Sequence, residues 1–237
     1  MIKILKNILS SNGYTQINID LPFQTQTIHL FSPNEENKRE EYFVTIQLHN
    51  QSNEAVQILL EQDAQELFEF ISQSGVVGLS FEKNCTMLIC HNENAIDRQL
   101  ILSIEEDQYN FKKNVITHSL HELEDLHNYL TTNNINEITN TVINEVINGE
   151  NGKDFLEFKG SQNNSRGYYS LIMKIILKLP FITYSPKEKE LTNLCLDIEN
   201  SFAPRYLSIY SQLLTSEKEW SEDDNYKQIE KIWGTLE

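Results

Sequence analysis

A chain of 237 residues, 39% of them hydrophobic and 23% charged, can bury a substantial core and has the composition of a soluble globular protein. Its 35 acidic and 19 basic residues give a formal net charge of -16. No apolar run approaches the roughly 20 residues that span a bilayer, and the first residues are not followed by the long apolar core or cleavage site of a signal peptide, so we expect a cytoplasmic protein. Three cysteines cannot all pair within one chain, which argues against a disulfide scaffold.

The charge is unevenly distributed along the chain. Residues 1–150 carry 8 basic and 22 acidic side chains, whereas residues 151–237 carry 11 and 13. Residues 153–189 hold seven of the basic ones: Lys153, Lys159, Arg166, Lys174, Lys178, Lys187 and Lys189. Because acidic surfaces repel phosphate backbones, we expect the isolated chain to bind DNA weakly. If the chain contacts DNA or an acidic partner directly, residues 153–189 are the expected place of contact.

The first half of the chain reads as mixed strand and helix. Residues 2–9 have the apolar spacing of a short helix, and residues 16–20 and 27–31 are strand-like. A polar loop over 32–40 precedes residues 42–48, whose side chains alternate with the period of a strand.

The period then becomes helical over residues 54–73, and Gly75 is a plausible stop. Two apolar runs follow, residues 86–90 and 100–104, joined by a polar connection. They suggest an antiparallel pair of strands.

Helices dominate the second half. Residues 118–130 and 135–147 are amphipathic, 154–159 is a short strand candidate, and 160–167 is a polar loop. Further helices are expected over 168–181, from 187 to about 202, and over 205–216 and 225–236. The sequence therefore predicts an α+β fold, with a mixed half containing an antiparallel sheet over 1–115 and a mainly helical half over 116–237. The two halves can pack as one compact unit.

Two segments are not explained by generic folding patterns. Residues 104–113 place Glu105, Glu106 and Asp107 at the end of an apolar run, followed by Tyr109, Phe111 and two lysines. Residues 169–181 form a helix that is apolar on nearly every side, interrupted by Ser170, Lys174 and Lys178 and ending in Lys-Leu-Pro-Phe. A helix of this kind is either buried in the core of its own chain or packed against another chain.

Together with the segments 42–48, 83–90 and 189–194, these motifs resemble the middle components of bacterial ABC-three-component (ABC-3C) defence systems. That family includes the small subunit of Lamassu-type anti-phage complexes. The central motif departs from the family pattern, which tends to have proline where Gln108 stands and an aromatic residue where Asn110 stands.

The resemblance implies a non-catalytic adaptor without a cofactor. Such a subunit joins an SMC-like ATPase, which senses foreign DNA, to an effector that is often a nuclease. It reaches DNA mainly through the complex and has no membrane partner.

Aromatic residues flanked by charge suit a desolvated protein contact, so both segments are predicted to form protein interfaces. The predicted interface residues are Tyr109, Phe111, Lys112, Lys113, Met173, Lys174, Leu177, Lys178 and Phe181. The alternative for the first segment is that Phe111 simply fills the core beneath the turn, because buried aromatic residues are common.

A rival hypothesis is a metal-dependent nuclease. Glu157 and Lys159 have the Glu-x-Lys form of one nuclease superfamily, and Glu145 or Glu150 is available as the second acid. The alternative is an edge strand with its charges in solvent. A third hypothesis is a regulator of some other cytoplasmic complex.

The remaining metal-ligating residue types do not have the spacing of a metal site. Glu105, Glu106 and Asp107 would point to opposite faces of a strand, so a Mg²⁺ site is not expected, and we interpret them as a solvated or partner-facing acidic strand end. Neither the histidines 118, 121 and 127 nor the group Cys85, Cys90 and His91 has the paired spacing of structural zinc. Surface histidines and buried thiols explain them, and no phosphate-binding glycine loop occurs.

Overall fold

The structure is a computed structural model that describes residues 1–35, 38–160, 166–186, 200–203, 206–207 and 227. The chain divides into two compact units, Met1–Pro186 and Lys187–Glu237. Most of the second unit, including Cys195 and the helices predicted beyond residue 186, lies outside the described residues, as do residues 161–165 of the predicted polar loop.

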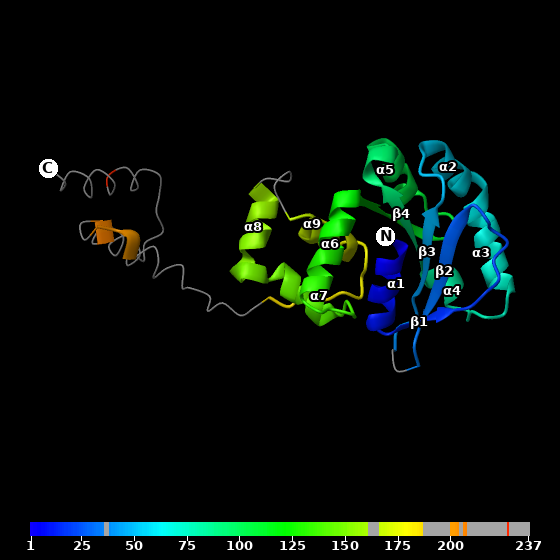
Figure 1. The fold of residues 1–237 in the computed structure, drawn as a ribbon, viewed down its shortest axis with the longest axis horizontal. Coiled ribbons are helices and arrows are strands. Elements are labelled where there is room, and N and C mark those ends of the chain that lie inside the picture. The colour runs from blue at the N-terminus through cyan, green and yellow to red at the C-terminus, as the bar shows by residue number, and fades with distance from the viewer. Residues whose placement is uncertain (36–37, 161–165, 187–199, 204–205, 208–226, 228–237) are drawn as a thin grey trace. The chain divides into compact units, whose positions relative to one another are not determined.

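A five-stranded sheet forms the centre of the first unit (Figure 1). Its strands lie in chain order: β1 (Tyr14–Ile17), β2 (Gln26–Pro33), β3 (Tyr42–Leu48), β4 (Cys85–Asn92) and β5 (Lys112–His118). The first three are antiparallel, whereas β3, β4 and β5 are parallel. The sheet is therefore mixed, and each parallel step needs a helical crossover.

The crossovers cover one face of the sheet. Between β3 and β4 lie α2 (Asn53–Ile58), the π-helix η1 (Leu59–Asp63), α3 (Ala64–Gln73) and α4 (Phe81–Asn84); η2 (Glu93–Ala95) and α5 (Arg98–Glu106) connect β4 to β5. Alternate strand residues such as Val44, Ile89 and Val115 pack against this layer in one core cluster. The predicted stop at Gly75 is confirmed by its left-handed backbone, φ 74°.

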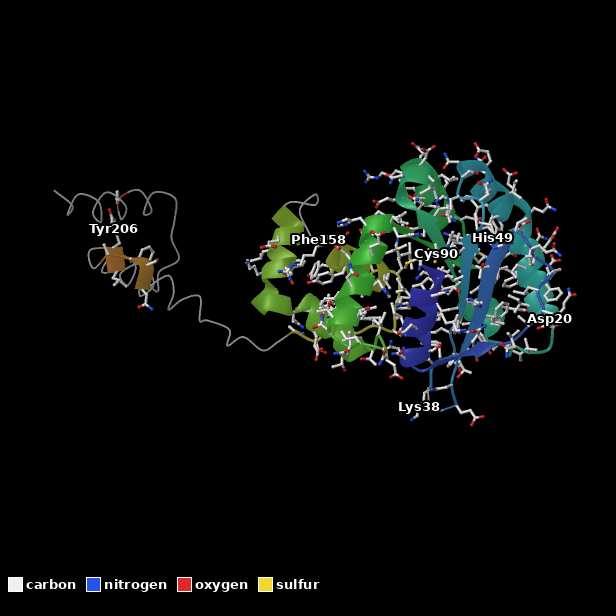
Figure 2. All side chains as sticks on the ribbon, viewed as in Figure 1. Asp20, Lys38, His49, Cys90, Phe158 and Tyr206 are labelled. Atoms are coloured by element: carbon white, nitrogen blue, oxygen red, sulfur yellow. The ribbon has the colours of Figure 1, made fainter. Side chains whose placement is uncertain are left out.

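Helices from both ends of the unit lie on the other side of the sheet, with α8 outermost (Figure 1). They are α1 (Ile2–Ser11), α6 (Leu120–Thr132), α7 (Asn140–Ile147), the short η3 (Gly149–Gly152), α8 (Lys153–Gly160) and α9 (Gly167–Ile176). Phe43, Leu88 and Ile116 face this layer and share a core with Leu5 and Ile172. Figure 2 shows Cys90 at the sheet, close to α1. Cys85 and Cys90 are buried free thiols, and burial raises the pKa of Cys90 to about 12.

The predicted α+β fold is confirmed, with two corrections to its elements. Residues 100–104 lie in α5, and β4 pairs in parallel with β5 instead of with them. The predicted strand at 154–159 is also wrong, because these residues form α8. In both places a short apolar run fits a buried strand and a helix equally well. No helix among the described residues is long and apolar enough to cross a bilayer.

Helices α6 and α9 approach each other closely at Gly167. A Cβ atom there would lie 2.7 Å from Asp125 Oδ2, 2.9 Å from His121 Nδ1 and 3.2 Å from Glu122 Cα. The Gly167 amide donates to Asp125 Oδ2 at 2.9 Å, so an α6 side chain caps the first turn of α9. The rings of Tyr129 and Tyr168 stack at 4.4 Å in the same interface.

Candidate functional site

The turn at residues 107–111, between α5 and β5, contains one exposed aromatic residue. Tyr109 is 82% exposed, whereas Phe111 is buried and its ring lies 5.1 Å from that of Phe68. Asn110 holds the turn in the left-handed conformation, φ 64°. Of the two aromatic residues of this turn that are predicted to form an interface, only Tyr109 is exposed at the surface. Phe111 fills the core, as the alternative interpretation expected.

The two lysines after the turn have different roles. Lys112 is exposed, whereas Lys113 is 2% exposed. Its ammonium donates to the Tyr109 carbonyl at 2.6 Å and lies 3.1 Å from Asp107 Oδ2. Lys113 therefore fixes the turn from inside, and its assignment to an interface is corrected. The sequence alone does not show which side chains of β5 point into the core, because their direction depends on the register of the sheet.

The three acids at the end of α5 diverge. Glu105 accepts from the Val115 amide at 2.9 Å and from Lys178 Nζ at 2.7 Å, so it covers the outer edge of β5. Asp107 pairs with Lys113, and Glu106 is exposed. Because they end a helix and bind separate partners, the interpretation of a solvated or partner-facing acidic strand end is wrong for Glu105 and Asp107.

Lys174 on α9 and Lys178, which follows the helix, form ion pairs within the chain. Lys174 Nζ lies 2.8 Å from Glu122 Oε1 and 2.8 Å from Glu93 Oε2. Glu122 is 7% exposed. Burial alone would raise the pKa of its carboxyl group, but the hydrogen bonds donated by Lys174 and Ser170 outweigh burial, so the pKa is lowered. Lys174 thus joins α9 to α6 and to the segment after β4.

The apolar sides of α9 are explained mostly by contacts within the chain. Tyr169, Leu171, Ile172 and Ile175 are buried, and Phe181, which follows the helix, is 5% exposed, with its ring 4.8 Å from that of Tyr14. The assignment of Phe181 to an interface is therefore corrected. The surface of α9 retains Leu177, 76% exposed, and the half-buried Met173 one turn before it.

A groove of about 360 Å³ lies beside Met173. It is lined by residues of α7, η3, α8, α9 and the following segment: Ile147, Asn148, Gly152, Phe155, Met173, Ile176 and Tyr184. Phe155 and Tyr184 are partly exposed at 43% and 58%. We call this surface the α8/α9 groove. Its lining is more apolar than that of the groove at Lys112 and that of the groove at Phe181.

The Glu-x-Lys pattern is not on a strand. Glu157 and Lys159 are two positions apart on α8, so their side chains point about 200° apart around the helix axis. Glu157 lies 3.7 Å from Lys153 in an exposed pair. Over the described residues, no cluster of three or more His, Cys, Asp or Glu side chains is arranged to hold a metal ion.

The histidines singled out in the sequence are dispersed. His118 ends β5 and is buried, His121 lies on α6 near Asp125, and His91 is fully buried at the end of β4. Burial and nearby positive charge lower the pKa of His118 to about 4. The interpretation as surface histidines is therefore wrong for His118.

The family model described as ABC-three component (ABC-3C) system Middle Component 1 matches residues 30–145. No curated protein and no solved structure is matched by the chain.

The matched region contains β3, β4, β5, the turn at 107–111 and α6, whereas α8 and α9 follow it. Residues 30–145 are thus identified as similar to the middle components of ABC-3C systems, the family that the sequence motifs resemble.

Proposed function

We propose that this middle component is the non-catalytic adaptor of an anti-phage complex of the Lamassu type. It joins an SMC-like, DNA-sensing ATPase to an effector subunit of the nuclease kind, and it controls the release or activation of that effector. The observation that carries the proposal is the family match over residues 30–145, because a middle component belongs to a system of several components.

Two exposed features support contacts with partner subunits. One is Tyr109 beside Lys112 at the end of the sheet, inside the family region. The other is at α9, where Met173 lines the α8/α9 groove and the exposed Leu177 follows it by one helical turn. Large apolar side chains at the surface of a folded unit are typical of interaction sites when they cluster.

A charge substitution at Leu177 tests this role. We expect Leu177→Glu to leave the fold intact, because the side chain is 76% exposed, and to reduce copurification of the ATPase or the effector. The matched control is Leu102→Glu on α5, where the side chain is 50% exposed. If Leu177→Glu leaves copurification unchanged, α9 is not part of the interface.

Tyr109 is expected to anchor the second contact. Truncation of an aromatic hot spot costs roughly 1–4 kcal/mol of binding free energy, so Tyr109→Ala should weaken assembly, and Lys112→Glu should weaken contact with an acidic partner. Leu120→Ala on α6, where the side chain is 71% exposed, is the control for loss of exposed apolar surface. Calorimetry with the purified partners measures the binding constants. A binding constant that Tyr109→Ala leaves unchanged would show that the residue lies outside the interface.

DNA binding by the isolated chain should be weak. Of the basic residues in 153–189, Lys153, Arg166, Lys174 and Lys178 each lie within ion-pair distance of a carboxylate. These pairs reduce the positive field available to a phosphate backbone. The proposal therefore places DNA recognition in the ATPase.

The enzyme alternative has a direct test. We expect no cleavage when the purified chain is incubated with plasmid DNA and Mg²⁺ or Mn²⁺, because Glu157 and Lys159 diverge on α8. Gel electrophoresis of the plasmid provides the measurement. Cleavage that disappears in Glu157→Ala would establish the nuclease function instead.

A further inference from the structure

The groove at Lys112 lies where the three parallel strands begin. It has a volume of about 600 Å³ and is lined by the residues just before β3, by α4 with the start of β4, and by the turn that leads into β5. Tyr42 and Cys85, the first residues of β3 and β4, are paired in the sheet, and Thr86 is paired with Lys112. Apart from Pro180, all lining residues fall inside the region that the family model matches. We call this surface the Lys112 groove.

A buried aromatic cluster holds two of the segments that line the groove. Phe81 begins α4, and Phe111 ends the turn at residues 107–111. Their rings lie 6.2 Å apart, and the ring of Phe68 lies 5.5 Å from the first and 5.1 Å from the second. Because the core fixes both segments, the side chains around the groove are presented by a defined backbone.

The two most exposed large apolar side chains of the described residues stand on these segments. Leu79, in the loop that leads into α4, is 96% exposed, and Tyr109, in the turn, is 82% exposed. The loop before α4 is fixed at its base, because the Gly78 amide donates to Tyr42 Oη at 3.1 Å. Large apolar side chains that gather at a surface are typical of interaction sites.

The groove lining carries charges of both signs. Glu40, Glu82, Lys83 and Lys112 line the groove and are exposed. None of the four forms an ion pair with another residue that the structure describes. A ligand of a single charge would meet two like charges in the groove, whereas a ligand with both signs complements it. Three side-chain amides add hydrogen-bond donors and acceptors to the lining: Asn84, Gln108 and Asn110.

We propose that the Lys112 groove, Leu79 and Tyr109 form one docking surface for a segment of a partner subunit that carries opposite charges between apolar side chains. The acidic and basic side chains of the segment enter the groove, and its apolar side chains pack on Leu79 and Tyr109. A small zwitterion would pair with the charges but would leave both apolar side chains in water. This inference rests on the adaptor function proposed above and names the chemistry of the contact in which Tyr109 and Lys112 take part.

An exchange of two adjacent charges tests the proposal on the full chain. Glu82→Lys combined with Lys83→Glu keeps the net charge and reverses the order of the charges in the groove. Calorimetry with the purified ATPase and the purified effector measures the affinity for each. The affinity for one of them should fall about tenfold or more, because partner charges then face like charges. The control exchange, Lys3→Glu on α1 with Glu124→Lys on α6, also joins two exposed positions and should leave both affinities unchanged.

Leu79→Ser tests the apolar part of the surface and does not depend on the folding of the exchange variant. It should weaken binding to the same partner about tenfold or more, because a leucine side chain is no longer buried on binding. The control is Ile58→Ser on α2, where the side chain is 55% exposed.

The outcomes separate this proposal from the adaptor function. Unchanged affinities in the charge exchange or in Leu79→Ser, or equal losses in the control variants, would overturn the docking surface. If the natural chain binds both partners and the variants bind them equally well, only the docking surface is wrong. A natural chain that binds neither partner would contradict the adaptor function as well.

Discussion

Lys174→Met is expected to lower the free energy of unfolding by about 3 kcal/mol. The substitution leaves the carboxylate of Glu122, whose side chain is 9% exposed, without its cationic partner. Removing one partner of a buried ion pair costs about 3–5 kcal/mol of stability. The side chain of Lys174 is 29% exposed, so we expect a value at the low end of that range. Urea unfolding followed by circular dichroism provides the measurement.

Two further lysines form a graded control series for this prediction. Lys178 pairs with Glu105, and their side chains are 27% and 23% exposed. Lys153 pairs with Glu157, where the exposed fractions are 64% and 48%. We expect the loss of stability to decrease from Lys174→Met to Lys178→Met and to be close to zero for Lys153→Met. Equal losses in all three variants would contradict the structural role of the Glu122 pair.

Acidification is expected to destabilise the protein through His118. The pKa of this imidazole is about 4 in the folded chain, whereas the ordinary value is 6.5. Between these values the unfolded chain binds the proton and the folded chain does not, so stability falls as the pH falls. The loss from His118 should be about 2 kcal/mol between pH 7 and pH 5.

A variant without the titrating group isolates this contribution. His118→Phe removes the imidazole, including Nδ1, which is buried and has no hydrogen-bond partner among the described residues. The pH dependence of its unfolding free energy between pH 7 and pH 5 should be weaker than that of the natural chain by the same amount. His127→Phe, at an exposed position on α6, is the matched control for the loss of an imidazole. A slope that is identical in the natural chain and in His118→Phe would contradict the lowered pKa.

Local patterns predicted much of the fold correctly. The alternation in residues 42–48 and the apolar spacing in residues 2–9 correspond to β3 and α1, because these periods depend only on neighbouring residues. The change to a helical period after residue 53 was likewise confirmed in α2 and α3. The parallel pairing of β3, β4 and β5 was missed, since strand direction depends on contacts between distant segments.

The candidate site was less predictable for the same reason. Tyr109 and Phe111 look alike in the sequence, yet one is exposed and the other is in the core. Lys113 follows Lys112, but the strand turns its side chain inward to Asp107. The α8/α9 groove was only partly foreseen through Met173, because α8 was predicted as a strand. Short apolar runs do not identify which face of an element is buried.

The adaptor function makes one direct prediction about assembly. When an affinity-tagged ATPase of the same system is coexpressed with the effector and this chain, we expect the effector to be recovered with the ATPase in stoichiometric amount. Omission of this chain should abolish recovery of the effector, and addition of the purified chain should restore it. Recovery of the effector by the ATPase without this chain would contradict the account.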